Sequence, residues 1–336
     1  MTKRWRRRPE GANWGDFGAD DQIGRLNLLT GDRVVRAAKE IRVGKRFCLS
    51  LPLDYPGGRV LAPHREPPVI EPSTRHGRSY FNLPFSHEDP ACGDCGSDDR
   101  VSLSTQYSTQ WDGLAHIGMQ ADVDGSGETR PVYYNGFGPA DGVLPPAERG
   151  SAPMPLGVDV MAETGLQGRG VLVDLEKHLG MERRHVGGAD LLRIMAADGI
   201  EVEEGDILCL RTGFARVVLE QEKTPDAETL NNACAVLDGA DQPLLDWITR
   251  SGIAAIAADN FAVEGIPSRE RERTGSFVPL HVHCLFKLGI PLGELWTFEA
   301  LAPWLRANDR HRFFLTAPPL RLPGAIGSPV TPVATV

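Results

Sequence analysis

Short apolar runs bounded by glycine or polar residues recur along the chain. A run of about five apolar residues between such boundaries is typical of a buried strand. This pattern predicts strands at residues 45–53, 171–175, 205–213, 253–258, 291–295, 312–315 and 332–336. Apolar residues at helical spacing predict helices at residues 31–38, 188–199, 241–251 and 280–288. Asp32 is the expected N-cap of the first helix.

The order of these elements indicates the fold class. Strands and helices alternate, though less strictly than in a doubly wound fold, and neither an internal repeat nor a linker interrupts them. Such alternation favours an α/β fold built on a mixed sheet. We therefore expect residues 1–336 to form a single domain.

Residues 54–100 break the pattern, because prolines, glycines and charged residues follow one another closely there. We expect this segment to be an irregular insertion in the domain. A long irregular segment of a compact domain is usually functional. It could serve as an active-site lid or as an oligomerisation arm.

The net charge of the chain and the length of its apolar runs argue against some classes of function. The 336 residues carry a net charge of -9, which disfavours nucleic acid as a partner. Apolar runs fall well short of the roughly 20 residues that span a bilayer, so we expect no membrane association. The basic start, residues 1–8, is not followed by the apolar stretch of a secretion signal. It should form a solvated arm on a cytoplasmic protein.

The cysteines give little indication of a disulfide framework or a metal site. The six cysteines are scattered, which is typical of cytosolic thiols. Cys92 and Cys95 form a CxxC pair, but a structural zinc site normally has four ligands and a second pair is lacking. A plain surface loop is the favoured interpretation of this pair, with a metal site as the alternative. The glycine-rich phosphate-binding motifs GxGxxG and GxxxxGK(S/T) do not occur in the sequence, so nothing indicates a nucleotide cofactor.

The first group of residues that could carry chemistry lies between positions 104 and 116. If residues 101–112 form one strand, the side chains of Gln106, Gln110 and Asp112 share a face, because strand side chains alternate. A polar face of this kind usually lines a site. Gly113 lets the chain turn, so that His116 can fold back toward Asp112. Trp111 should pack on the opposite face, with substrate contact as the alternative.

The second group lies in residues 279–296. The pattern predicts a short helix that carries His281, a glycine turn, and a strand end that carries Glu294. Histidine and glutamate are both common ligands of zinc and manganese. Either residue alone would more often be structural, and only the combination of the two groups favours a metal site.

Together these residues resemble the cyclase family, which includes bacterial kynurenine formamidase and isatin hydrolase. That family carries the motif HxGTHxDxxxH and a later His and Glu. The matching positions here are Gln106, Gln110, Asp112, His116, His281 and Glu294. Further similar segments, among them residues 21–30, 169–174 and 319–324, extend the resemblance over nearly the whole chain.

The resemblance implies a swivelling β/β/α fold and a zinc- or manganese-dependent hydrolase. In formamidase-like members the two motif histidines hold one metal and the later histidine holds the second. The Asp and Glu bridge both metals, and the last motif histidine is the general acid/base, which implies this role for His116. The resemblance to this family also implies that the chain forms a homodimer or homotetramer.

This chain departs from the motif because Gln106 and Gln110 stand at the two metal-binding histidine positions. A glutamine oxygen is a weak ligand compared with imidazole. The chain therefore resembles a divergent subgroup, in which Asp112, His281 and Glu294 would bind one Mn or Zn ion rather than two; a metal-free protein is the alternative. Gln106 and Gln110 would be weak ligands or contact the substrate.

The function expected from this resemblance is hydrolysis of a C–N bond (amide, formamide or lactam) or an ester bond in a small molecule, by metal-activated water. Two alternatives stay open. One is a metal-free cyclase, isomerase or lyase that uses His116. The other is a small-molecule-binding relative without catalysis.

Overall fold

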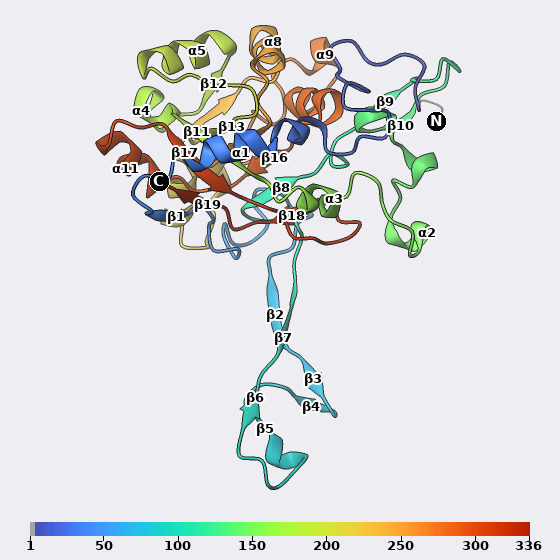
Figure 1. Ribbon diagram of the computed structural model, residues 1–336, viewed down its shortest axis with the longest axis vertical. Coiled ribbons are helices and arrows are strands. Elements are labelled where there is room, and N and C mark those ends of the chain that lie inside the picture. Colours follow the sequence, from blue (N-terminus) through green and yellow to red (C-terminus); the bar gives the residue numbers. More distant parts are fainter. Residues whose placement is uncertain (1–3) are drawn as a thin grey trace.

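The computed structural model describes residues 4–336, and a nine-stranded sheet organises the body of the protein (Figure 1). The strand order is β1-β19-β17-β11-β13-β15-β16-β8-β18. The strands are β1 (Arg46–Cys48), β8 (Gln110–Asp112), β11 (Gln167–Asp174), β13 (Ile207–Arg211), β15 (Ala255–Ala258), β16 (Leu292–Glu294), β17 (Arg312–Thr316), β18 (Gly327–Pro329) and β19 (Val333–Thr335). The predicted α/β class with a mixed sheet is confirmed.

The centre of the sheet is parallel and its two sides are antiparallel. Strands β11, β13, β15 and β16 run parallel to one another. Strand β8 pairs antiparallel with both β16 and β18. All residues of β13 and β15 are buried, as expected of apolar strands that are covered on both faces.

The helices cover both faces of this sheet. They are α1 (Gly31–Ala38), α2 (Pro146–Arg149), α3 (Val158–Glu163), α4 (Leu175–Leu179), α5 (Gly188–Ala197), α6 (Phe214–Glu220), α7 (Ala227–Asn232), α8 (Gln242–Ser251), α9 (Arg271–Thr274), α10 (Pro279–His281) and α11 (Leu301–Ala307). A π-helix, η5 (Val282–Leu288), continues α10 directly. Four 3-10 turns are η1 (Gly24–Leu28), η2 (Phe85–His87), η3 (Tyr134–Gly136) and η4 (Pro139–Asp141). Two small pairs are β9 (Met119–Ala121) with β10 (Arg130–Val132), and β12 (Arg184–Val186) with β14 (Ala235–Leu237).

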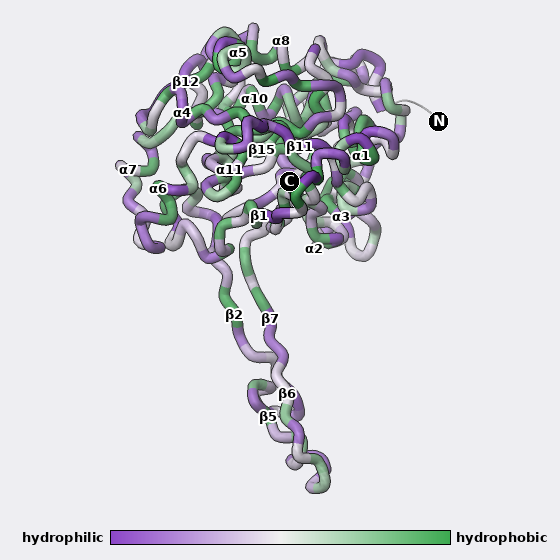
Figure 2. Tube along the Cα trace, turned by 60° about the vertical axis from the view of Figure 1, so that its left-hand side comes forward, coloured by the Kyte–Doolittle hydropathy of each residue, from purple (hydrophilic) through white to green (hydrophobic). Residues whose placement is uncertain are grey.

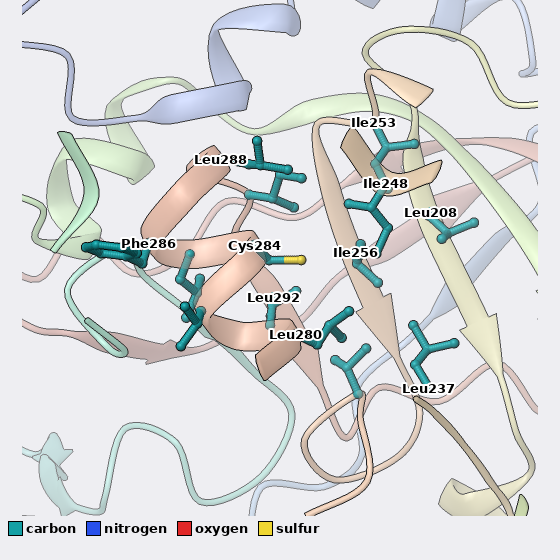
Figure 3. Close-up of a cluster of buried hydrophobic side chains, with 14 of the residues drawn as sticks. Leu208, Leu237, Ile248, Ile253, Ile256, Leu280, Cys284, Phe286, Leu288 and Leu292 are labelled. Carbon is teal, nitrogen blue, oxygen red and sulfur yellow. The ribbon is translucent and has the colours of Figure 1, made fainter. Parts of the chain in front are cut away.

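One face of the sheet packs against α5, α8 and the α10–η5 helix. Leu208, Ile256 and Leu292 point from three neighbouring strands toward Ile248 of α8 and Cys284 of η5 (Figure 3). Because side chains alternate along a strand, Ile207 and Cys209 point to the opposite face. There they join a second core with α11 and Trp296.

Residues 69–102 form an arm that leaves the body (Figures 1 and 2). We expect residues 54–100 to be irregular, but the arm, which includes most of them, contains short antiparallel pairs. They are β2 (Val69–Pro72) with β7 (Asp99–Ser102), β3 (Thr74–Arg75) with β4 (Arg78–Ser79), and β5 (Leu83–Pro84) with β6 (Cys95–Gly96). Cys92 and Cys95 lie on this arm as free thiols. In the part of the chain that the structure describes, they belong to no cluster of three or more candidate metal ligands.

Three local predictions are wrong. The residue before α1 is Thr30, so Asp32 lies within the first turn and is not the N-cap. Residues 101–112 do not form one strand, because β7 ends at Ser102 and β8 begins at Gln110. The basic N-terminal segment is not simply solvated, since Trp5 is buried beside Trp14. Residues 1–3 lie outside the described part.

Among residues 4–336, no helix combines the length and apolar character needed to cross a bilayer.

Candidate metal centre

Strands β8 and β16 bring two carboxylates to one face of the sheet. Gln110 lies opposite Glu294 in the antiparallel register, and Asp112 follows two residues later on the same face. Both carboxylates are buried. The Gln110 Nε2 group donates to Asp112 Oδ1 at 3.3 Å and to Glu294 Oε2 at 3.1 Å. The amide thus links the two carboxylates.

His281 reaches the same point from the end of α10. Its Nε2 lies 3.3 Å from Glu294 Oε1 and 3.9 Å from Asp112 Oδ2. Three potential ligand atoms, one each from Asp112, His281 and Glu294, lie within 4.8 Å of one another. All three residues are buried. Two segments far apart in sequence therefore converge on one point, as the sequence predicts.

Glu264 fixes the orientation of His281. Its Oε1 accepts from His281 Nδ1 at 2.8 Å and from the backbone N–H of His281 at 2.9 Å, and its Oε2 accepts from Leu280 N at 3.1 Å. The same carboxylate therefore satisfies the free N–H groups at the start of α10. Gly239 leaves room for it, because an added Cβ there would overlap the carboxylate.

The backbone beside these carboxylates is strained. Ala262 (φ 75°) and Val263 (φ 57°) precede Glu264 in left-handed conformations, and Leu295 (φ 53°) directly follows Glu294. A β-branched residue such as valine is a rare outlier in this region. Strain of this kind clusters at functional sites, where the surrounding structure holds it in place.

The electrostatics of the cluster keep His281 protonated. Burial alone would lower the pKa of His281, but the hydrogen bonds and charges of Glu264 and Glu294 outweigh it and raise that pKa to about 10. Both ring nitrogens of His281 then donate, one to each glutamate. Asp112 Oδ2 and Gln110 Oε1 are buried and have no hydrogen-bond partner among the described residues.

His116 lies at the edge of this cluster. Its backbone N–H donates to Gly113 O at 3.0 Å, so the chain turns back after β8 as the sequence predicts. The His116 Nε2 atom lies 4.0 Å from Asp112 Oδ1, and 21% of its side chain is exposed, whereas those of Asp112, His281 and Glu294 are buried. Among these four residues, His116 is the one that a substrate in solvent can reach.

Gln106 joins His116 to Asp112. Its Nε2 donates to Asp112 Oδ1 at 2.5 Å and lies 2.9 Å from His116 Nδ1. Although Gln106 lies in the loop before β8, its side chain still reaches the site. Gly327 of β18 permits this close approach, because an added Cβ there would overlap the Gln106 side chain.

Trp111 is not part of the site. Its indole N–H donates to Ala317 O at 2.8 Å, and its ring packs edge-on against Trp296 with the centroids 4.9 Å apart. It belongs to the core on the opposite face of the sheet. The expected packing role is therefore the observed one, and the alternative of substrate contact is wrong.

Sequence reasoning missed Glu264. The signal was present, since Glu264 follows the carboxyl end of the buried parallel strand β15. Polar residues just beyond such strand ends often form sites in open α/β sheets.

A cavity of about 350 Å³ lies elsewhere, lined by Arg42, Arg310 and Arg312 together with acidic residues. None of the predicted site residues lines it.

Comparison with known proteins gives two kinds of match. The family model described as "Putative cyclase" matches residues 49–265, which include Asp112 and His116. A crystal structure described as a novel cyclase is 31% identical, with a TM-score of 0.76, and the match covers 97% of each chain. No curated protein matches the chain significantly.

Two isatin hydrolases share the fold at lower identity. Isatin hydrolase A from Labrenzia aggregata, bound to benzyl benzoate, is 14% identical with a TM-score of 0.58, over 91% of this chain and 98% of that one. Isatin hydrolase A from Ralstonia solanacearum is 15% identical with a TM-score of 0.54, over 89% of this chain and 93% of that one.

Proposed function

Because the chain belongs to the cyclase family, we propose that it is a metal-dependent hydrolase that cleaves an amide, formamide, lactam or ester bond of a small molecule. The observation that carries this proposal is the convergence of Asp112, His281 and Glu294 on one buried point beside His116. The isatin hydrolases with the same fold support a cyclic amide as one substrate class.

The residues present fit a single divalent ion. Two carboxylates and one imidazole are a common ligand set for zinc or manganese. The unpartnered oxygen of Asp112 favours a cation there, because a buried carboxylate oxygen without a partner is costly. Asp112, His281 and Glu294 would hold the ion. When bound, such an ion supplies a Lewis acid and makes water acidic enough to ionise near neutral pH.

His116 is suited to donate a proton. The Gln106 amide nitrogen can only donate, so His116 Nδ1 accepts from it and the neutral ring carries its proton on Nε2. That nitrogen lies on the partly exposed side chain beside Asp112. The Nε2–H group would therefore donate a hydrogen bond to the leaving nitrogen or oxygen. As general acid/base, the ring would first take up the proton that the attacking water loses and would then return one proton to the leaving group, which restores the neutral ring.

Gln110 would hold the two carboxylates at a fixed separation. Its Nε2 hydrogens are directed to Asp112 and Glu294, so its Oε1 is free to accept from a substrate N–H or to act as a weak ligand. Glu264 would keep His281 in one orientation.

A specific observation also favours a metal-free enzyme as the second candidate. The Gln110 amide already donates to both carboxylates, and the protonated His281 offsets part of their negative charge without a metal ion. A metal-free cyclase, isomerase or lyase would then use His116 with the two glutamine amides.

Turnover assays separate these candidates. Aryl formamides, lactams and small esters are assayed with protein that has been dialysed against chelator and then supplied with Mn or Zn. For the hydrolase, turnover requires the ion, and His116→Ala lowers it at least about 100-fold. The matched control is His76→Ala, since His76 is exposed on the arm. Full turnover of the chelated protein would favour the metal-free enzyme, and unchanged turnover of His116→Ala would reject the role of His116.

A further inference from the structure

Arg65 is a half-buried cation that has no carboxylate partner. It lies just before the arm, and no acidic side chain of the described residues 4–336 forms an ion pair with it. By contrast, Arg59 on the same segment pairs with Glu66 at 2.5 Å. A charged group that has lost part of its hydration is usually paired. Arg65 therefore offers a positive charge that the chain itself does not neutralise.

The Arg65 guanidinium is held in place by two contacts that use few of its donors. Its Nη1 donates to Gln106 O at 2.6 Å, and its central carbon lies 5.6 Å from the centroid of the Phe261 ring. A guanidinium has five N–H donors, arranged in a fork that matches the two oxygens of a carboxylate. Since its other nitrogens make no side-chain hydrogen bond to the described residues, most of this fork is available to a ligand.

A shallow hollow beside Arg65 has the size of one carboxylate oxygen. Arg65, Tyr107 and Phe261 line it together with residues between positions 56 and 62. Its volume of about 10 Å³ has room for a single water-sized group. A carboxylate can place one oxygen there and direct the other to the remaining N–H groups, whereas a phosphate has a third oxygen to accommodate. The hollow therefore favours a carboxylate.

Arg65 and Phe261 border the candidate metal centre. Gln106, whose carbonyl accepts from Arg65, places its side-chain Nε2 2.9 Å from His116 Nδ1. His116 is the partly exposed member of that centre. Phe261 lies in the loop after β15 that leads to Glu264. Gln106 alone therefore separates the unpaired guanidinium from His116, so one small substrate can contact both.

Given the proposed function, on which this step rests, we propose that Arg65 determines specificity and that the substrate carries a carboxylate in addition to the bond that is cleaved. The guanidinium binds this carboxylate, and the Phe261 ring packs against the apolar part of the substrate. The bond to be cleaved then lies beside His116. Charge favours this orientation, because Asp112 and Glu294 repel a carboxylate whereas Arg65 attracts it.

Paired substrates test the specificity. The three isomers of formamidobenzoate are assayed beside the corresponding neutral formamidobenzamides, with protein supplied with Mn or Zn. For at least one isomer, the wild-type kcat/KM should be about 10- to 100-fold higher for the benzoate than for the benzamide. Arg65→Gln should remove this preference mainly through KM, because a contact made equally in ground and transition states leaves kcat unchanged. Arg65→Lys should restore part of it. Arg78→Gln removes an exposed charge on the arm and should keep the preference.

A binding measurement tests the same contact without turnover. Benzoate and benzamide are titrated into the full-length protein by ligand-observed NMR, after dialysis against chelator so that the carboxylate cannot bind an ion instead. Benzoate should bind the wild type and Arg78→Gln at least about tenfold more tightly than it binds Arg65→Gln. Benzamide should bind all three proteins equally.

The outcomes separate the carboxylate contact from the proposed function. If no formamide is turned over but benzoate binding still depends on Arg65, the hydrolase is rejected and the carboxylate site stands. If Arg65→Gln weakens benzoate and benzamide to the same extent, Arg65 is only structural and the proposal is overturned. Equal benzoate affinities of Arg65→Gln and the wild type, or no benzoate binding to the wild type, would overturn it as well.

Discussion

Glu264 Oε1 and His281 Nδ1 lie 2.8 Å apart inside the core, and this contact directs the other ring nitrogen of His281 toward Asp112 and Glu294. A histidine that binds a metal commonly donates its second N–H to a carboxylate in this way, which fixes the ring and raises its basicity. Glu264 therefore holds His281 in the orientation that the proposed metal centre requires.

Replacement of Glu264 by Gln should weaken ion binding. The amide oxygen can still accept from His281 Nδ1, but the negative charge is lost, and changes of this type typically cost about 10- to 100-fold in affinity. Because the substitution also lowers the His281 pKa and so eases release of its proton, calorimetric titrations with Mn or Zn are made at several pH values, and the affinities are compared after correction for the released proton. Glu40→Gln is the control, because that carboxylate is also largely buried but pairs with Arg310. Equal affinities of Glu264→Gln and the wild type would show that Glu264 does not act on the ion.

Ion affinity should depend on pH through His281. Its pKa is raised to about 10 by Glu264 and Glu294 despite burial, so the ring is protonated at neutral pH. An ion that binds Nε2 must displace that proton. Apparent affinity should therefore rise by up to about tenfold per pH unit below this pKa, with about one proton released per ion. Titrations between pH 6 and 8 in two buffers of different ionisation enthalpy measure both quantities. Binding without proton release would contradict the assignment of His281 as a ligand.

Restoring histidine at both glutamine positions should create a second ion site. Gln106 and Gln110 stand where the family motif has histidine, and imidazole binds zinc far better than a neutral amide oxygen. We expect Gln106→His/Gln110→His to bind two zinc ions and the wild type to bind one. Elemental analysis gives the ratio, and Gln106→Ala/Gln110→Ala should not exceed one. A single ion in the double histidine variant would show that the cluster cannot accommodate a second.

Arg25 should contribute to stability away from the site. Its buried guanidinium donates to the backbone oxygens of Ile248 at 2.8 Å and Thr249 at 2.6 Å, near the end of α8. A cation at a helix C-terminus is favourable, and removing it takes the side-chain donor from Thr249 O, whereas Ile248 O keeps the Ser251 hydroxyl at 3.0 Å. Arg25→Met should therefore lower the free energy of unfolding by about 3 kcal/mol. Denaturant titration measures this loss, and Arg36→Met on the exposed face of α1 should change it by less than about 0.5 kcal/mol.

The sequence predicted those parts of the fold that depend on local pattern. Strands β13 and β15 are continuous apolar runs, and helix α5 has Leu191, Ile194 and Met195 at helical spacing, so both kinds of element were recognisable. The prediction of one strand over residues 101–112 is wrong because polar residues can also alternate in a loop. Gln106 reaches Asp112 from that loop, which local pattern cannot show.

The arm could not be derived from local pattern either, and the only signal for Glu264 was its place beyond the end of β15. The strands of the arm are two to four residues long, and β2 and β7 are exposed throughout, so they carry no periodic apolar signal. Glu264 follows Ala262 and Val263, whose left-handed backbone conformations are rare for these residue types and are not signalled by the sequence. By contrast, Asp112, His116, His281 and Glu294 were found because their residue types and spacing match a family motif.

Metal content is the most direct test of the central claim that Asp112, His281 and Glu294 hold one divalent ion. Protein purified without chelator is analysed by mass spectrometry for Mn and Zn, together with Asp112→Ala, His281→Ala and the surface control His76→Ala. We predict about one ion per chain in the wild type and the control, and less than about a tenth of that in the other two variants. Wild-type protein without metal after incubation with Mn and Zn, or the same metal content in all four proteins, would contradict the claim.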